Sequence, residues 1–158
     1  MKTPSDPLGS QAFGELLGGA SVCDALSIEE TATALWHRFK GDLGAIARSR
    51  RLRVVWVAYM PPLVPAMLHG REIFVARGMR AARTRVSLAH EIAHDVLGPR
   101  AAHADVWALT LALLAPAPLL VSILPGSTML ARVAVIPAWG AEIRLEMAAC
   151  LKIVARVA

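Results

Sequence analysis

Two histidines with a glutamate between them lie in the segment SLAHEIAHDVLGPR, residues 87–100. His90 and His94 are four residues apart, so on a helix they project from one face, one turn apart, and can bind one metal ion. Glu91 lies about 100° further round the helix and can reach a water at the metal without binding the metal. The pattern therefore predicts a zinc site with His90 and His94 as ligands and Glu91 as the general base of a hydrolysis.

The same segment also fits a helix that carries two histidines and no metal. The bare pattern occurs in many proteins without zinc, so its context decides between the two interpretations. Apolar residues and the two histidines repeat at helical spacing from residue 86 to residue 97, and Gly98-Pro99 is a stop signal directly afterwards. This context favours the zinc site.

The elements that would position this helix can be predicted from patterns along the rest of the chain. SIEE, residues 27–30, has the form of a capping box and predicts that a helix begins there. LRVVWVAYM, residues 52–60, predicts a strand, and AMLHGREIFVAR, residues 66–77, predicts a hairpin with its turn near residues 69 and 70. Further helices are expected from about residue 79 to 97, from residue 101 or 102 to 116, and within 139–157.

This order of elements predicts an α+β fold, in which a small sheet packs on a helical domain that carries the HExxH helix. We expect residues 1–26 to form a flexible N-terminal arm and residues 27–158 to form a single domain. Trp56, Trp107 and Trp139 are predicted to fill the core, as large aromatic side chains at apolar spacings usually do.

Composition limits the compartment and the partners. The 17 Lys and Arg exceed the 12 Asp and Glu, but the arginines are spread out and no nucleic-acid-binding signature accompanies them, so no direct contact with nucleic acid is expected. The two cysteines form no CxxC motif, which fits a reducing compartment. The first 19 residues lack the apolar run of a signal peptide. These features predict a cytoplasmic protein.

One uncharged segment, VWALTLALLAPAPLLVSIL at residues 106–124, is near the length of a membrane span. Pro116 and Pro118 lie in its middle, where they would break a helix. We therefore predict a buried helix, a turn marked by proline and a second apolar segment. A membrane-associated protein is the weaker alternative.

The segment ARTRVSLAHEIAHDVLG, residues 82–98, resembles the catalytic helix of the ImmA/IrrE family of zinc-dependent metallopeptidases, many of which are carried on prophages and mobile elements. GREIFVARGM upstream is similar to the family's preceding strand, and ADVWALTLALLAP and VIPAWGAEIRLEMA downstream are similar to its later helices. The resemblance covers roughly residues 52–147. It implies a cytoplasmic zinc metallopeptidase that cuts a protein partner, such as a DNA-binding repressor of a mobile element.

The resemblance leaves the third metal ligand open. In the family, a glutamate three residues before an Ala-Asp or Ala-Asn pair completes the site, and that position here is Ala101, which cannot bind zinc. If LLAP sets the register instead, the ligand position becomes His103. Asp105 lies one helical turn after Ala101 on the same face, and we prefer it narrowly. On a regular helix His103 and Asp105 are about 200° apart, so they should not both reach one zinc ion.

Two classes of function follow from these residues. The first is a zinc-dependent metallopeptidase whose sheet, beside the catalytic helix, holds an extended peptide by strand addition. The alternative is a non-catalytic interaction module, which keeps the fold, has a degenerate metal site and binds a repressor or another regulator. The zinc content of the purified protein separates the two.

Overall fold

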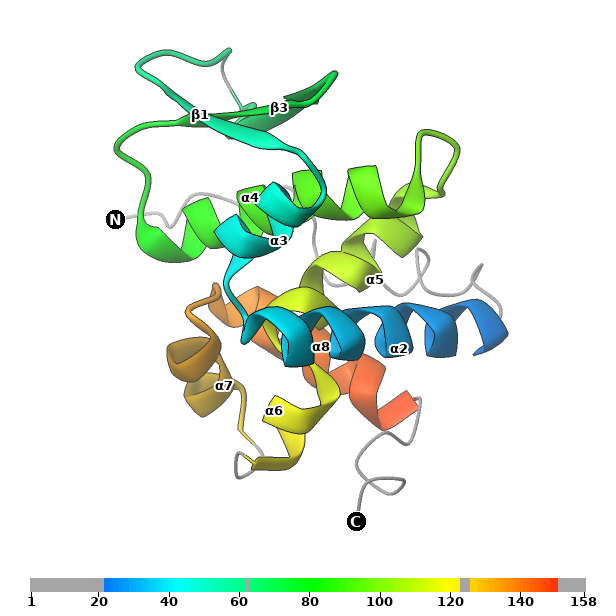
Figure 1. The fold of residues 1–158 in the computed structure, drawn as a ribbon. Coiled ribbons are helices and arrows are strands. Elements are labelled where there is room, and N and C mark those ends of the chain that lie inside the picture. The colour runs from blue at the N-terminus through cyan, green and yellow to red at the C-terminus, as the bar shows by residue number, and fades with distance from the viewer. Residues whose placement is uncertain (1–21, 62, 123–125, 151–158) are drawn as a thin grey trace.

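The computed structural model describes residues 22–61, 63–122 and 126–150. Within these residues the chain forms seven helices and a three-stranded sheet, which confirms the predicted α+β class. The elements are α2 (Val22–Phe39), α3 (Leu43–Ser49), β1 (Arg53–Val57), β2 (Ala66–His69), β3 (Glu72–Ala76), α4 (Ala81–Leu97), α5 (His103–Leu114), α6 (Ala117–Ser122), α7 (Ser127–Ala134) and α8 (Ala138–Cys150). Figure 1 shows the sheet on one side of the molecule, with α4 between it and the other long helices.

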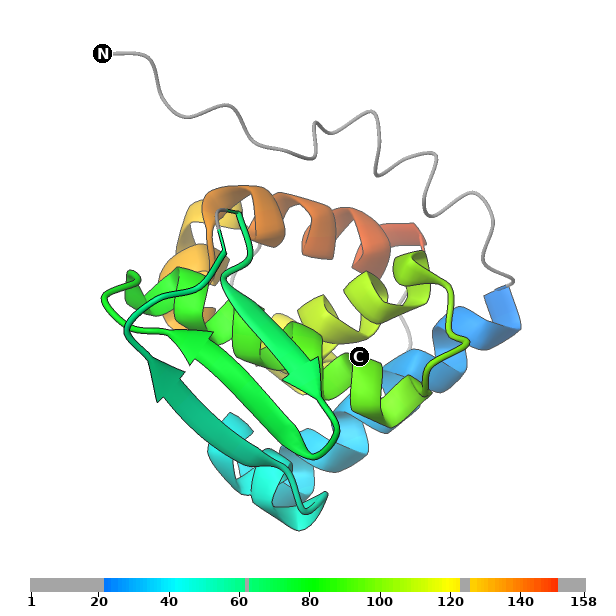
Figure 2. The same ribbon diagram turned by 90° about the horizontal axis from the view of Figure 1, so that it is seen from above.

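The sheet has the order β1-β3-β2, so β2 is an edge strand. β1 runs parallel to β3, with Arg53 opposite Glu72, and β2 runs antiparallel to β3, with Ala66 opposite Val75. The three directions are clear in the view from above (Figure 2). Ile73 and Val75 of the central strand are fully buried, as expected for alternate residues that face a covering helix. The predicted hairpin is thus confirmed.

A tight turn joins the two helices that matter most for the site. α4 ends at Leu97, and the backbone N–H of the following Gly98 donates to the carbonyl of His94 at 2.9 Å. Gly98 has φ +86°. Glycine adopts this backbone conformation readily, whereas a residue with a side chain is strained in it. α5 begins at His103 and packs along α4. The stop signal at Gly98-Pro99 therefore ends the helix where the sequence predicts.

The uncharged segment folds as predicted, with a proline turn between two helices. α5 is buried along most of its length, including Leu109 and Leu111 at 0% exposure. Its last turn is followed by Pro116, and α6 covers residues 117–122, while residues 123–125 lie outside the described residues. Within the described ranges, no helix combines the length and the hydropathy that a membrane span requires.

A buried ion pair connects three parts of the helical layer. Arg144 of α8 is 0% exposed, and its Nη2 donates to Oε2 of Glu29 of α2 at 2.8 Å. Its Nε donates to the carbonyl oxygen of Ala115 at 2.7 Å. That carbonyl follows the last residue of α5, so one guanidinium group joins α2, α8 and the end of α5.

Several details of the prediction are wrong. α2 begins at Val22, so the helix does not start at the SIEE segment, and Ser27 is an exposed residue inside it. Trp56 does not fill the core. It lies near the end of β1, an edge strand of the sheet, and its exposed fraction is 47%. α7 was not predicted. Residues 1–21, most of the expected arm, and residues 151–158, the end of the last predicted helix, lie outside the described residues.

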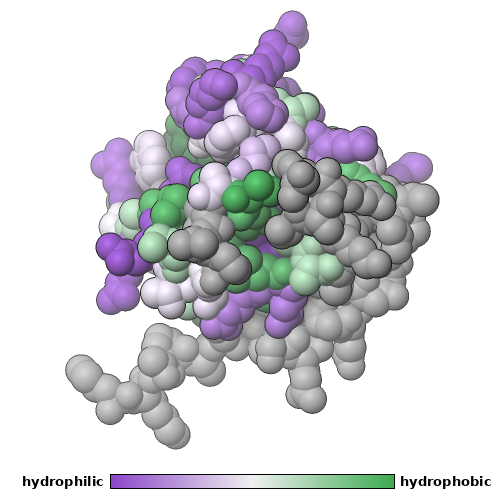
Figure 3. Space-filling view, turned by 90° about the horizontal axis from the view of Figure 1, so that it is seen from below, coloured by the Kyte–Doolittle hydropathy of each residue, from purple (hydrophilic) through white to green (hydrophobic). Residues whose placement is uncertain are grey.

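Hydrophobic residues reach the surface on the side of the helical layer away from the sheet. Figure 3 shows green residues among polar ones on this face. On α6 and α7, the exposed fractions are 40% for Val121 and 49% each for Met129 and Val133. This surface is separate from the side of the molecule on which α4 meets the sheet (Figure 1).

Candidate metal centre

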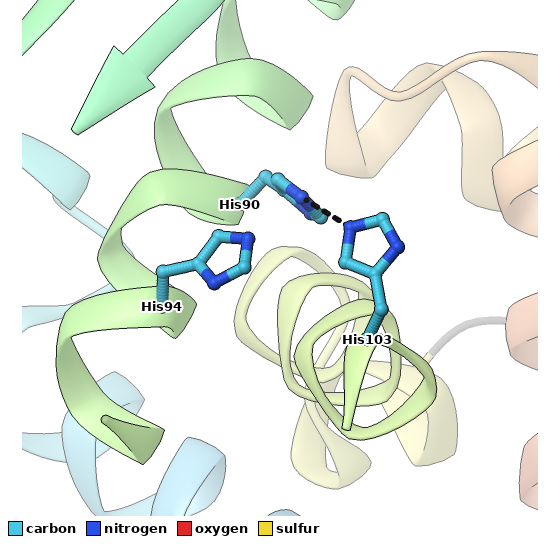
Figure 4. A group of neighbouring side chains, drawn as sticks. All are labelled: His90, His94 and His103. Atoms are coloured by element: carbon cyan, nitrogen blue, oxygen red, sulfur yellow. Dashed lines mark hydrogen bonds between the residues drawn. The ribbon is translucent and has the colours of Figure 1, made fainter. Parts of the chain in front are cut away.

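Two consecutive helices, α4 and α5, place three histidines together. His90 and His94 lie on one face of α4, while Ala89, Ile92 and Ala93 are buried elsewhere on the helix. The turn after α4 brings His103, the first residue of α5, back against them. Figure 4 shows the three imidazole rings converging on a common region between α4 and α5.

The distances among the three imidazoles fit a transition-metal site. One nitrogen from each ring lies within 4.8 Å of the other two, and Nε2 of His90 is 3.1 Å from Nε2 of His103. A tetrahedral zinc ion with bonds of 2.0–2.1 Å holds its ligand atoms about 3.3 Å apart. The separations among the three nitrogens exceed that spacing by no more than about 1.5 Å. Imidazole also suits copper, iron and nickel, so this donor set by itself does not select one metal.

The environment keeps His90 neutral. Burial, together with the smaller effect of the neighbouring His94 and His103, lowers the pKa of His90 to about 3. Burial also lowers the pKa of His94. A metal binds the unprotonated imidazole. At neutral pH these two rings are therefore unprotonated. Each can bind a metal ion through a lone pair without first releasing a proton.

One face of α5 packs against His90. His103, Trp107 and Thr110 follow the i, i+4, i+7 spacing of a helix face, and all three contact the His90 ring. The Trp107 and His90 ring centroids are 4.3 Å apart, and Trp107 packs edge-on against Trp139 at 5.8 Å. Thr110 Oγ1 lies 3.3 Å from Nδ1 of His90. The spacing is visible in the sequence, but Trp107 and Thr110 were not predicted as neighbours of the site.

Glu91 lies where α4 meets the edge strand of the sheet. Its Oε2 accepts a hydrogen bond from the backbone N–H of Leu68 on the edge strand β2, at 2.9 Å. Burial raises the pKa of Glu91, while this hydrogen bond and the charge of His103 act in the opposite direction. The carboxylate is therefore held at the junction of α4 and β2, next to the metal-binding face of the helix.

A cleft of about 450 Å³ lies between β2 and the second half of α4. Its walls come from the edge strand on one side and from α4 and the following turn on the other. They consist of Ala66, Met67, Leu68, Glu91, His94, Asp95, Gly98 and Pro99. Glu91 and one member of the histidine group thus face a space large enough for a few residues of a peptide.

Two arginines fix the end of α4 beside this cleft. The side chain of Asp95 is 9% exposed and forms ion pairs with Arg50 and with Arg71, the latter at 2.9 Å. Nη2 of Arg50 also donates to the backbone carbonyl of Asp95 at 3.1 Å. Arg50 follows α3 and Arg71 lies in the hairpin turn. Asp95 therefore has a structural role that sequence reasoning did not identify.

The structure brings together His90 and His94 with His103, the alternative third ligand, and not with the preferred Asp105. Asp105 also lies in the first turn of α5, but the 200° between the two positions directs it away from the face that meets α4. Ala101 lies in the turn before the helix. Where the chain is described, the group that could hold a metal ion is His90, His94 and His103.

The fold and site define an α+β domain with a three-histidine cluster next to a cleft. Comparison of the chain with models of known protein families, with curated proteins and with solved structures gave no match. The resemblance to the ImmA/IrrE metallopeptidases therefore rests on the sequence segments that carry it.

Proposed function

We propose that this chain is a zinc-dependent metallopeptidase that hydrolyses a peptide bond in a protein partner. The observation that supports this most is the meeting of His90, His94 and His103 on the face of α4 that adjoins Glu91. Three neutral protein ligands leave a fourth position of a tetrahedral zinc ion open, which is the arrangement of catalytic zinc sites. A closed structural site would use all four positions for protein ligands.

The chain's own residues supply the remaining chemistry. A zinc ion at the three imidazoles would polarise a carbonyl group and acidify water. Glu91 would accept the proton from the attacking water and then deliver it to the leaving amine. Its raised pKa makes the carboxylate a better proton acceptor. The Leu68 N–H holds Glu91 towards the cleft, where that water and the substrate carbonyl must meet.

The edge strand β2 is the element that would hold the substrate. It pairs with β3 on one side only, so its other edge offers backbone groups to an extended peptide. Ala66, Met67 and Leu68 line the cleft on this side, and Met67 is 45% exposed. A peptide added there would pass Glu91 and His94. A mobile-element repressor as the partner is what the resemblance implies.

The alternative function is a non-catalytic interaction module that binds a repressor or another regulator. One observation favours it: the 3.1 Å between the Nε2 atoms of His90 and His103 also suits a direct hydrogen bond between the two rings, which requires no metal. In that case the histidine group would be a structural contact between α4 and α5. Metal content separates this alternative from the peptidase.

The experiment compares the wild-type chain with Glu91→Gln and with Glu142→Gln, a matched control at an exposed position of α8. Each protein is purified without added metal, its zinc is measured by elemental analysis, and cleavage of a fluorogenic peptide library is followed. We expect about one zinc per chain in all three, with cleavage in the wild type and in Glu142→Gln only, because an amide cannot take the proton from water. Loss of zinc from Glu91→Gln, or unchanged cleavage by it, would contradict the role of Glu91.

A further inference from the structure

Thr110 is a polar residue in a buried and otherwise apolar part of α5. Its exposed fraction is 0%, and its neighbours Leu109 and Leu111 are equally buried. Valine has nearly the same shape and would pack there without a hydroxyl group. The hydroxyl group therefore needs an explanation from its contacts.

The two contacts of this hydroxyl group fix the direction of its hydrogen bonds. Thr110 Oγ1 donates to the backbone carbonyl of Val106 at 2.6 Å, and it lies 3.3 Å from Nδ1 of His90. A hydroxyl group has one proton and two lone pairs. Because the proton is directed to Val106, only a lone pair faces His90. Nδ1 of His90 must therefore be the donor.

This direction determines the tautomer of His90. A neutral imidazole has one proton, so a proton on Nδ1 leaves Nε2 with a free lone pair. Nε2 is the atom that faces the other histidines, 3.1 Å from Nε2 of His103. In the opposite tautomer a proton would occupy the atom that has to bind the metal.

We propose that Thr110 is a positioning residue that holds His90 in the Nδ1–H tautomer, so that Nε2 is available as a metal ligand. The consequence for metal affinity rests on the proposed function, but the tautomer itself is a property of the metal-free chain. Partners that hold the second ring nitrogen of a metal-binding histidine typically change metal affinity 10-fold to 100-fold. The same size of effect is expected here.

The test uses Thr110→Val, which removes the acceptor and keeps the shape, and Thr110→Ser, which keeps the hydroxyl group. Thr84→Val is the matched control, because Thr84 of α4 makes the same type of bond, to the carbonyl of Arg80, without contacting His90. The tautomer is read from the ring nitrogen signals of the metal-free, ¹⁵N-labelled protein by NMR. Zinc affinity is measured separately, by competition with a chromophoric chelator.

We expect the Nδ1–H form of His90 in the wild type, Thr110→Ser and Thr84→Val, and a shift to the Nε2–H form in Thr110→Val. Zinc should bind about 10-fold to 100-fold more weakly to Thr110→Val than to the control. An unchanged tautomer in Thr110→Val would overturn the proposal. If Thr110→Val does not fold, the His90 tautomer is compared between Thr110→Ala and Thr110→Ser. An unchanged tautomer in Thr110→Ala would then overturn the proposal. Absence of zinc binding by the wild type would contradict the proposed function and leave the tautomer result standing.

Discussion

Replacing Arg144 with methionine tests how the buried ion pair holds the helical layer together. The change leaves the carboxylate of Glu29, 6% exposed, without its cation, and it removes the donor to the carbonyl of Ala115. Removing one partner of a buried pair typically costs about 3–5 kcal/mol, because an uncompensated charge stays in the interior. For a chain of this length about 1 kcal/mol corresponds to 2–4 °C in Tm, so the melting temperature should fall by roughly 6–20 °C.

The assay is thermal and urea unfolding followed by circular dichroism. The double variant Arg144→Met with Glu29→Leu leaves neither charge buried, so it should be more stable than Arg144→Met alone. Arg48→Met is the control, since Arg48 faces Asp42 at 3.8 Å on the surface with 74% exposure, and an exposed pair contributes under about 1 kcal/mol. A cost below about 1 kcal/mol for Arg144→Met, or a double variant less stable than that single one, would refute the reasoning.

Two further predictions concern the site and complete those made for Glu91. In the metal-free chain, unfolded His90 takes up a proton below about pH 6.5, whereas the folded state does so only near pH 3. The free energy of unfolding should therefore fall with falling pH in that window, by up to about 1.4 kcal/mol per pH unit; equal slopes in urea melts of the wild type and His90→Gln would count against this. Gly98→Ala should cost about 1–3 kcal/mol and weaken metal binding, because alanine resists φ +86° with ψ 171° in the turn that places His103. Gly126→Ala, at an extended φ of −179°, should change little and is the control.

The HExxH helix α4 was predictable because its signals are local. The spacing of His90 and His94 and the stop at Gly98-Pro99 each involve neighbouring residues, and α4 ends where they indicate. The hairpin and the proline break after α5 are local for the same reason. In contrast, the SIEE segment has a local pattern that the longer α2 overrides, because the helix continues back to Val22.

The third ligand was not predictable from local signals alone. On α5 a shift of one residue turns a side chain by about 100°, so the choice between His103 and Asp105 depends on how the helix packs on α4. The LLAP register indicated His103, and the gapless register indicated Ala101. Packing decides between them, since the face with His103, Trp107 and Thr110 is the one that meets His90.

The ion pairs between residues far apart in the chain could not be predicted from the sequence either. Glu29 and Arg144 are 115 residues apart in the chain, and Arg50 and Asp95 are 45 residues apart. Charged residues at such positions look like solvent-facing ones in a sequence, because only the folded chain shows that an opposite charge lies next to them. Trp56 shows the reverse case, an aromatic residue that an edge strand leaves at the surface.

A zinc titration of three proteins tests the central claim most directly. The wild type, His103→Ala and Asp105→Ala are stripped of metal and titrated with zinc in competition with a chromophoric chelator. The structure places His103 with His90 and His94, and does not place Asp105 there. We predict one zinc per chain for the wild type and for Asp105→Ala with similar affinity, and a large loss of affinity for His103→Ala. Equal binding by His103→Ala and the wild type, or no zinc binding by the wild type, would contradict the three-histidine metal site.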